Sequence, residues 1–451
     1  MNLKCIHKFD IGRNVSYTFS CNVKLGDRDG MLFLTTPGAG VDPGEELFDY
    51  YGIQPVYLVM FDMDGTKLWE KELPHGVLPG IWFCPTIAFD MDKDGIDEIY
   101  FVNNYGKPFS MTRRKLERLD ALTGETTGIW PWSMNTFHER LSLCYRYYLV
   151  AGYVHGEPVL VTCQGTYGNM YLQGWNADME NRWDIVIKEE DPGPRASHVT
   201  PVIDINGDGI DELFWGERLL SLDDGHEIVC LAPNYKGHSD LIVPYRVPGS
   251  DEWYIFTARE GDEREDQSRV YVFKNNGEVV WQAIDKGHMH TNWIANVKGE
   301  HKKIAMTRRR ITIYDDCGAE IEELEDDLFF DAFTGEQLDI KYPFTGKEVW
   351  PVDIDGDGYH EFIRNNGEIY NSLGEKIGAV PGGAFRIGKM SSAPGEHLMI
   401  SRGTTVEIWG DADAVESPEF KKRYELPYLH FMQKLMASGY NAEGSQISCG
   451  V

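Results

Sequence analysis

Three loops in the sequence carry acidic residues at alternate positions, in the pattern D-x-[DN]-x-D-G-x-x-E. Side chains at alternate positions of a turning loop converge on one point, and the glycine permits the sharp turn. Hard cations such as Ca²⁺ take oxygen ligands, so each loop is predicted to bind one; the alternative is a solvated polar turn. The predicted ligands are Asp90, Asp92, Asp94 and Glu98; Asp204, Asn206, Asp208 and Glu212; and Asp353, Asp355, Asp357 and Glu361.

A second group of candidate residues is rich in histidine and arginine. The chain holds only 13 His, yet one or two occur at the same point of four consecutive repeat units: His138, His198, His238, and His288 with His290. With arginines nearby, they would form a pocket for an anionic ligand that bears a carboxylate. Each histidine alone could be structural, and several together could hold an additional divalent metal ion.

Two alternating sequence repeats must position these residues. One is a hairpin, clearest at 56–69 and 270–281, with a tight turn between alternating apolar strands. The other places a polar loop between two apolar strands and is clearest at 85–102, 201–215 and 350–363. Together they give four antiparallel strands per unit and eight units. This pattern predicts an all-β protein, an eight-bladed β-propeller, with seven blades as the alternative.

The propeller is predicted to occupy residues 1–418, followed by a C-terminal closing segment, 419–451, with a short helix from Pro427 that Gly439 ends. In a four-stranded blade, the turn between the first and second strands lies on the face opposite the connection that leads into the first strand. The carboxylate loops are turns between a first and a second strand. The histidines lie on the connections that lead into a first strand. We therefore expect the two groups on opposite faces, with the cation loops bracing the blades and taking no part in chemistry.

The composition limits the classes of partner that the chain is expected to bind. The chain has 43 Lys and Arg against 72 Asp and Glu, a formal net charge of -29, so we expect it to bind neither nucleic acid nor a membrane surface. The eight cysteines contain no C-x-x-C pair, and neither a signal peptide nor a transmembrane stretch is evident. A cytoplasmic protein is expected, unless a leader has been removed. Composition leaves the oligomeric state open.

The run Val202-Ile-Asp-Ile-Asn-Gly-Asp-Gly-Ile-Asp-Glu-Leu213, followed by Gly237-His-Ser-Asp240, resembles the rhamnogalacturonan lyases of polysaccharide lyase family 11. The tail from Phe420 to Asn441 is similar to the closing segment of that family. The resemblance implies a lyase that acts on an acidic oligosaccharide or polysaccharide and carries structural Ca²⁺. The chain is shorter than those enzymes, and their N-terminal β domain is expected to be absent. Ulvan and oligogalacturonate lyases place similar residues on the same kind of face, so the sugar stays open.

For such a lyase, the chemistry is β-elimination at a uronic acid. A base removes the C5 proton beside the carboxylate, a cation neutralises the carboxylate, and an acid protonates the departing O4. His138 and His198 are the predicted base and its partner, and Tyr167 the acid or a second base. Arg195 and Arg259 are the predicted carboxylate clamp. The predicted substrate-binding residues are His238, Asp240, Arg259, His290 and Arg218.

Two other classes of propeller are alternatives to a lyase. A non-catalytic calcium-binding propeller with integrin-like repeats would bind a protein or glycan and should expose an apolar patch in place of converging His and Arg. A quinone-dependent dehydrogenase would carry regularly spaced tryptophans, whereas the 12 Trp are expected at differing blade positions. The lyase is therefore the preferred interpretation.

Overall fold

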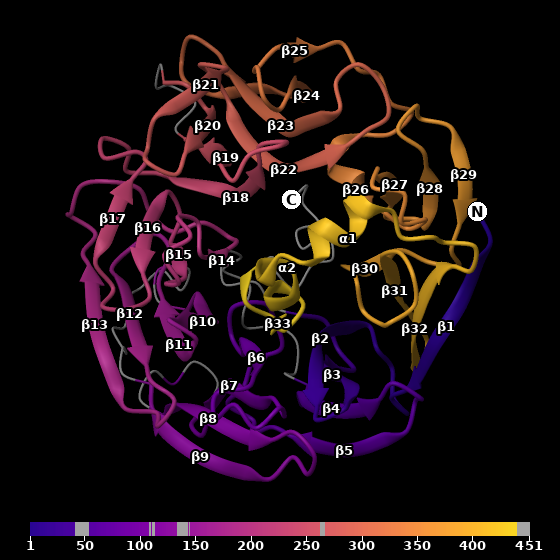
Figure 1. The fold of residues 1–451 in the computed structure, drawn as a ribbon. Coiled ribbons are helices and arrows are strands. Elements are labelled where there is room, and N and C mark those ends of the chain that lie inside the picture. The colour runs from indigo at the N-terminus through magenta and orange to yellow at the C-terminus, as the bar shows by residue number, and fades with distance from the viewer. Residues whose placement is uncertain are drawn as a thin grey trace.

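The computed structural model describes residues 1–40, 54–107, 110, 113–132, 143, 145–261 and 267–439. The strands within these ranges form eight antiparallel sheets of four strands each, one of which gains a fifth strand near the C-terminus. The sheets follow one another around a central space (Figure 1). We number them 1 to 8 in chain order.

The strand bounds are as follows. Sheet 1 contains β2 (Tyr17–Leu25), β3 (Arg28–Thr36), β4 (Tyr57–Asp62) and β5 (Lys67–Glu72). Sheet 2 contains β6 (Thr86–Phe89), β7 (Glu98–Asn104), β8 (Arg114–Asp120) and β9 (Thr126–Pro131). Sheet 3 contains β10 (Tyr147–Val154), β11 (Glu157–Gln164), β12 (Met170–Trp175) and β13 (Asn181–Ile187). Sheet 4 contains β14 (Val202–Ile203), β15 (Glu212–Phe214), β16 (Arg218–Ser221) and β17 (Glu227–Cys230).

Sheet 5 contains β18 (His238–Arg246), β19 (Trp253–Glu260), β20 (Val270–Lys274) and β21 (Val279–Ala283). Sheet 6 contains β22 (His288–Asn296), β23 (Lys303–Tyr314), β24 (Glu320–Asp331) and β25 (Gln337–Leu338). A 3₁₀ turn, η2 (Gly346–Glu348), leads into sheet 7, which contains β26 (Val349–Val352), β27 (Glu361–Arg364), β28 (Glu368–Tyr370) and β29 (Lys376–Ala379). Sheet 8 joins β30 (Ala384–Gly388), β31 (His397–Arg402) and β32 (Thr405–Asp411) to β1 (Leu3–Asp10).

The inner strands are buried almost throughout, because each sheet packs between two others. In β11, for example, only the first residue, Glu157, is exposed, whereas the outer strand β13 alternates buried and exposed residues. This difference explains why the inner strands read as apolar runs and the outer ones as alternating patterns.

Three tryptophans of outer strands make the same contact with the next sheet. Each indole N–H donates to a backbone carbonyl: Trp69 to Ala121, Trp183 to Leu222, and Trp281 to Ala332. The turn that receives each indole holds a glycine, Gly124, Gly225 or Gly335, where a Cβ would lie 2.7–2.9 Å from the ring. The expectation that the tryptophans occupy differing blade positions is therefore wrong for these three.

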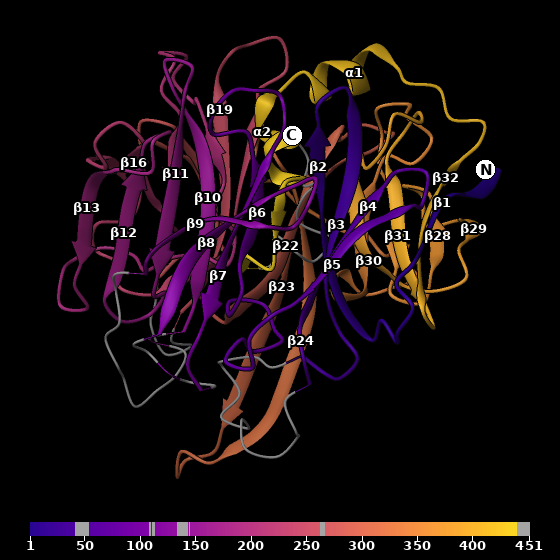
Figure 2. The same cartoon turned by 90° about the horizontal axis from the view of Figure 1, so that it is seen from below.

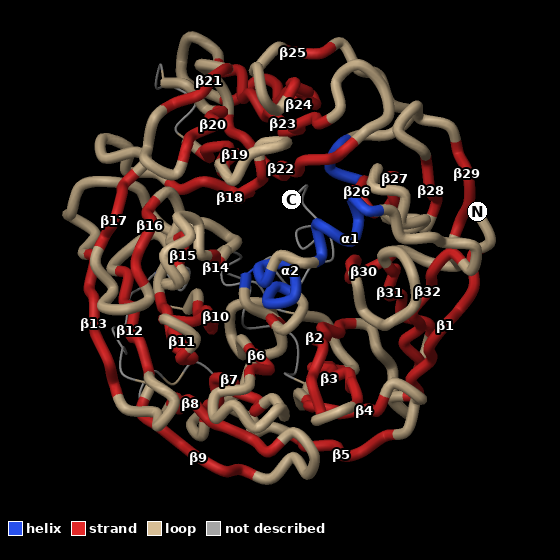
Figure 3. The backbone as a smooth tube through the Cα atoms, in the orientation of Figure 1, coloured by secondary structure: helices blue, strands red, loops and turns tan. Residues whose placement is uncertain are grey.

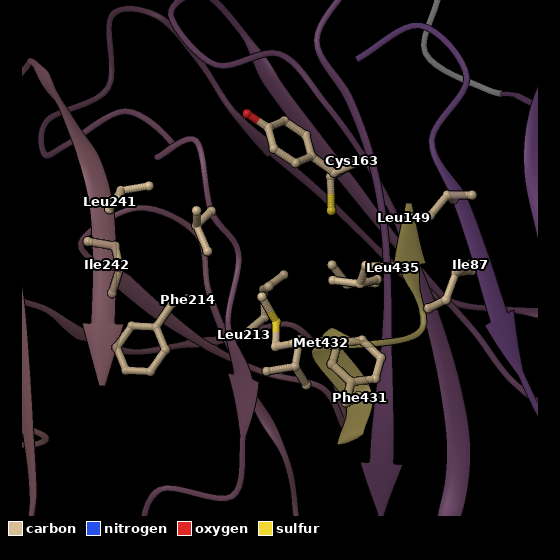
Figure 4. Packing of buried hydrophobic residues seen from close by; sticks show 14 of the residues in the cluster. Ile87, Leu149, Cys163, Leu213, Phe214, Leu241, Ile242, Phe431, Met432 and Leu435 are labelled. Atoms are coloured by element: carbon tan, nitrogen blue, oxygen red, sulfur yellow. The ribbon is translucent and has the colours of Figure 1, made fainter. Parts of the chain in front are cut away.

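The C-terminal segment lies over the centre of the ring as two short helices (Figure 3). These are α1 (Pro418–Tyr424), capped by Ser417, and α2 (Pro427–Met432). The predicted helix from Pro427 ends at Met432, earlier than expected, because β33 (Leu435–Met436) follows and pairs with β6 in sheet 2. Phe431, Met432 and Leu435 pack against inner strands of several sheets (Figure 4).

The hairpin of β23 and β24 is longer than the others, with 12 residues in each strand. It extends beyond the body of the molecule at one end (Figure 2). Of the helices in the described residues, none has both the length and the apolar character needed to cross a membrane.

Candidate functional site

Four histidines surround the carboxylate of Glu260, the last residue of β19. His238 Nε2 lies 2.8 Å from Glu260 Oε2, and His288 Nε2 lies 3.3 Å from the same oxygen. His290 Nδ1 lies 3.4 Å and His198 Nε2 3.7 Å from Oε1. The histidines predicted to share one topological point are thus brought together, except for His138, which lies outside the described residues. We call these five residues the histidine cluster.

The four histidines of the cluster lie at or in the first strands of three consecutive sheets, as the sequence predicts, and Glu260 ends a second strand. His198 precedes β14, His238 begins β18, and His288 and His290 lie in β22. The pairing of β18 with β19 shifts between Ser239 and Ile242, and that of β22 with β23 shifts after His290. Such irregularities re-aim side chains and are frequent beside active sites.

Charge in the cluster is concentrated on Glu260. Burial alone would raise its pKa, but the charge of His238 and the bonds from His198, His238 and His288 outweigh burial and hold the pKa well below the usual value. Glu260 is therefore ionised. Asp240 adds a second carboxylate, with Oδ1 4.0 Å from His198 Nε2.

His198 is the most buried member, with 4% of its side chain exposed. Burial lowers its pKa to about 3, so the ring is neutral near pH 7. Arg146 Nη1 lies 3.2 Å from His198 Nδ1. Since a guanidinium can only donate, Nδ1 accepts and the ring proton resides on Nε2, toward Glu260. A ring with so low a pKa is a weak base, so the base role predicted for His198 does not fit this environment.

Arg146 is a site residue that the sequence interpretation missed. Its guanidinium carbon lies 4.5 Å from the ring centroid of Trp82 and 4.8 Å from that of Tyr167. Tyr167 also packs edge-on against His238, with centroids 4.6 Å apart, so its predicted place in the site is supported. Arg146 stands just before a first strand, as His198 does, and that shared position is the signal that could have found it. Glu260, the other omission, directly follows the predicted Arg259.

The three arginines predicted for substrate instead hold the protein together. Arg195 donates to the backbone carbonyls of Lys188, Asp191, Gly193 and Gly168. Arg218 donates to the carbonyls of Pro192 and Pro194 and pairs with Glu227. Arg259 donates from Nε at 2.8 Å and from Nη2 at 2.6 Å to the two carboxylate oxygens of Glu217. These guanidinium groups are buried and most of their donors are used internally, which argues against the predicted clamp by Arg195 and Arg259 and against substrate binding by Arg218.

The three carboxylate loops share one hydrogen-bond pattern and join the first and second strands of sheets 2, 4 and 7, as predicted. In each, the first Asp accepts from the backbone N–H five residues later at 3.0 Å. The closing Glu accepts from the residue after that first Asp. Oxygens of Asp90, Asp92 and Asp94 converge within 4.8 Å of one another, as do those of Asp353, Asp355 and Asp357. In the loop at Asp204, the amide of Asn206 donates to Glu212.

Carboxylate groups crowd these loops, and in the third loop Arg423 pairs with Asp353 and Lys298 with Asp357. Burial, with repulsion from nearby Asp, raises the pKa of Glu98 to about 7, of Glu212 to about 8 and of Glu361 to about 9. Oδ1 of Asp353 is buried without a hydrogen bond among the described residues. Both observations fit the oxygen donors of a hard cation site.

The histidine cluster also offers donors for a divalent cation. Ligand atoms of His198, His238 and Glu260 lie within 4.8 Å of one another, and so do those of Glu260, His288 and His290. His198 could serve only if its proton left Nε2, which the contact with Arg146 opposes. The second set has no such restriction, and its imidazoles suit transition metals better than Ca²⁺.

Comparison with known proteins points to one group of enzymes. No family model matches the chain. It is 26% identical over 294 residues to rhamnogalacturonan exolyase YesX of Bacillus subtilis (strain 168), covering 51% of this chain and 46% of that protein. It is 21% identical over 310 residues to rhamnogalacturonan endolyase YesW of the same organism, covering 59% of this chain and 48% of the relative. Over these residues the chain is similar to rhamnogalacturonan lyases.

Solved structures of these lyases share the fold. That of exotype lyase YesX superimposes with a TM-score of 0.71 at 16% identity, over 95% of this chain and 77% of the other. The Bacillus licheniformis rhamnogalacturonan lyase PL11 gives 0.65 at 16% identity, with the same coverage. The sequence resemblance to family 11 is thus confirmed. The chain spans about half the length of the curated relatives it matches.

Proposed function

We propose that this chain is a carbohydrate lyase that cleaves a uronate-containing polysaccharide of the rhamnogalacturonan type by β-elimination. The single observation that carries the proposal is the histidine cluster, with Arg146 and Tyr167 beside it. Imidazoles, a guanidinium and a phenol are the groups that bind a sugar carboxylate and move protons near neutral pH. The proposed substrate class, rhamnogalacturonan, is that of the similar lyases YesX and YesW.

We infer further that the eight sheets are the blades of one propeller. Support comes from β1, which completes sheet 8 by pairing with β32, from Leu3 opposite Asp411 to Asp10 opposite Thr405. The same sheet thereby holds residues from both ends of the described chain. A propeller places the starts of all first strands on one face near its axis, where a polymer can reach them.

His290 is the proposed base. It is the most exposed imidazole of the cluster, with 35% of its side chain accessible against 20% for His288 and 12% for His238. Its Nδ1 lies beside Glu260, so the proton there is held by the carboxylate and the lone pair of Nε2 points away from it. This orientation suits removal of the C5 proton of a uronate.

Arg146 is proposed to neutralise the substrate carboxylate, and Tyr167 to protonate O4. Arg146 is fixed between Trp82 and Tyr167, so its charge is positioned before substrate arrives. Preorganised charge of this kind stabilises the enolate-like character that develops as the C5 proton departs. The ring of Tyr167 packs on His238 and lies near Arg146, which places its phenol at the same centre.

A divalent cation is a second candidate for neutralising the carboxylate, favoured by the converging donors of Glu260, His288 and His290. When bound, it would act as a Lewis acid toward the carboxylate. Separately, the three carboxylate loops are proposed to hold structural Ca²⁺. The loops follow the first strands, whereas the histidines lie where those strands begin. We therefore propose that the loops take no part in the reaction.

The test is to incubate the protein with rhamnogalacturonan, polygalacturonate and ulvan and to follow the ultraviolet absorbance of the unsaturated product. We expect product from rhamnogalacturonan, and metal analysis of the same preparation decides whether a transition metal accompanies Ca²⁺. Absence of product from all three glycans, with retained glycan binding, would favour the non-catalytic propeller.

A further inference from the structure

A buried ion pair lies directly behind the histidine cluster. Glu217 and Arg259 are 0% and 4% exposed. Arg259 donates from Nε at 2.8 Å and from Nη2 at 2.6 Å, one bond to each carboxylate oxygen of Glu217. The Ser239 hydroxyl donates to the same carboxylate. Glu217 comes from the turn between β15 and β16 of sheet 4, whereas its two partners belong to sheet 5, so the pair joins neighbouring sheets.

The partners of Glu217 are the chain neighbours of two cluster residues. His238 pairs with Glu260 across β18 and β19, and Ser239 pairs with Arg259 at the next position. Successive side chains of a strand point to opposite faces. His238 and Glu260 therefore face the site, while Ser239 and Arg259 face Glu217 on the other side of the same two strands.

Tyr235 completes the arrangement. Its hydroxyl contacts the carbonyl oxygens of His238 at 2.9 Å and Glu260 at 3.3 Å. The guanidinium of Arg259 packs on the Tyr235 ring at 4.6 Å and on the Tyr271 ring at 4.0 Å. Tyr235 thus fixes the backbone of His238 and Glu260, and Arg259 fixes the opposite face of the same two strands.

We propose that Glu217 and Arg259 are positioning residues, which hold Glu260 and His238 in the geometry that orients the other imidazoles. This inference rests on the proposed function for its consequence in catalysis, and on geometry alone for its effect on the cluster. A displacement of about 1 Å in a reacting group can lower the rate on the order of 100-fold. Strand ends fray readily, and a cross-sheet ion pair is a means of preventing it here.

The variants are chosen to distinguish an effect on the position of the cluster residues from an effect on the stability of the protein. Glu217→Gln keeps the shape of the side chain and removes the charge that holds Arg259. Glu217→Gln combined with Arg259→Met removes both charges, so that no unpaired buried charge is left to destabilise the fold. Glu117→Gln is the matched control, because Glu117 is also buried and accepts three hydrogen bonds, from Asn103, Tyr105 and Thr126 of sheet 2 and its loop.

Three quantities are measured for each full-length variant: Tm, kcat and KM on rhamnogalacturonan, and the ring-nitrogen NMR signals of the histidines at fixed pH. We expect both Glu217 variants to shift the signals of His238 and His290 and to lower kcat on the order of 10- to 100-fold, with KM nearly unchanged. The control should change Tm alone.

Wild-type kcat and ring signals in the double variant would overturn the proposal, whatever its Tm. If the double variant does not fold, Arg259→Lys, which keeps both charges but loses the fork, takes its place with the same expectations. If the wild-type protein cleaves no rhamnogalacturonan, the proposed function fails, and the ring signals alone decide whether the pair positions the cluster.

Discussion

Arg146 Nη1 lies 3.2 Å from Nδ1 of His198, and this contact determines which nitrogen of the most buried histidine carries the proton. The guanidinium takes the lone pair of Nδ1, so Nε2–H faces Glu260 and Asp240. Arg146 therefore acts in two directions. It fixes the tautomer of His198, and it places a positive charge at the centre where a uronate carboxylate is expected.

The first prediction concerns this charge. Arg146→Lys keeps a cation but loses the planar group that packs between Trp82 and Tyr167. We expect binding of a uronate product to weaken by about 1–3 kcal/mol, the range for charge-assisted hydrogen bonds. Isothermal titration of the variant and the wild type measures the change. Arg218→Lys is the control, since Arg218 bonds to carbonyls and Glu227 away from the cluster. Equal affinities of Arg146→Lys and wild type would remove Arg146 from substrate binding.

The second prediction separates two histidines. His290→Ala should lower kcat by about 10²-fold or more, as expected for loss of a general base, and leave Tm close to the wild-type value because the side chain is partly exposed. His198→Ala should instead lower Tm, because it leaves Arg146 buried without its acceptor. Turnover and melting on the same preparations decide between the roles. A large loss of kcat in the His198 variant at unchanged Tm would restore the base role to His198.

The third prediction concerns the carboxylate loops. A chelator should lower Tm, because an ion that binds only the folded chain stabilises it by mass action. Asp94→Ala and Asp208→Ala should each reduce the increment in Tm that added Ca²⁺ produces. Asp64→Ala, in an exposed hairpin turn, is the control and should leave that increment intact. Melting curves that are identical with and without the chelator would show that the loops are solvated turns.

The fourth prediction is a pH dependence of the calcium-free protein. Burial, followed by repulsion from neighbouring Asp, raises the pKa of Glu361 from 4.5 to about 9, and the pKa of Glu212 is raised to about 8. The folded state therefore binds these protons more tightly than the unfolded state, so their stabilising contribution is complete at low pH and is lost as pH rises. We expect the free energy of unfolding to fall between about pH 4.5 and pH 9.

Saturating Ca²⁺ should abolish this slope, because the cation supplies the charge that the protons otherwise provide. Urea unfolding at a series of pH values, with chelator or with Ca²⁺, measures both conditions. A flat stability profile in chelator would mean that these carboxyl groups are not crowded in solution as they are in the structure.

Much of the fold could be predicted because its signals are local. Tight turns with Gly, Asp or Asn mark the hairpins, and a carboxylate loop such as 90–98 identifies the turn between a first and a second strand. Given that topology, the sequence also places His198, His238 and His290 at equivalent points, and the structure brings them together around one carboxylate.

What could not be predicted depends on contacts between sheets. Arg259 is charged and near the site in sequence, but its partner Glu217 lies 42 positions away in another sheet. Whether a guanidinium is used internally or faces substrate depends on such a partner, and spacing alone does not reveal it. For the same reason Arg195, whose acceptors are backbone carbonyls, appeared available, and Arg146 was overlooked. The equivalence of Trp69, Trp183 and Trp281 had a local signal, because the hairpin turns before them, at Asp62, Asn176 and Lys274, have the same length and hydrogen bonds.

The pairing of β1 with β32 has a consequence for biosynthesis. Asn2 N donates to Asp411 Oδ1 across 409 positions, so sheet 8 cannot be completed until residues near 411 have emerged from the ribosome. At roughly 5–20 residues per second, β1 waits about 20–80 s without its partner. An unpaired strand edge invites aggregation, and lysines on such an edge oppose it. Lys4 and Lys8, which lie on β1, are expected to oppose this aggregation until β1 pairs with β32.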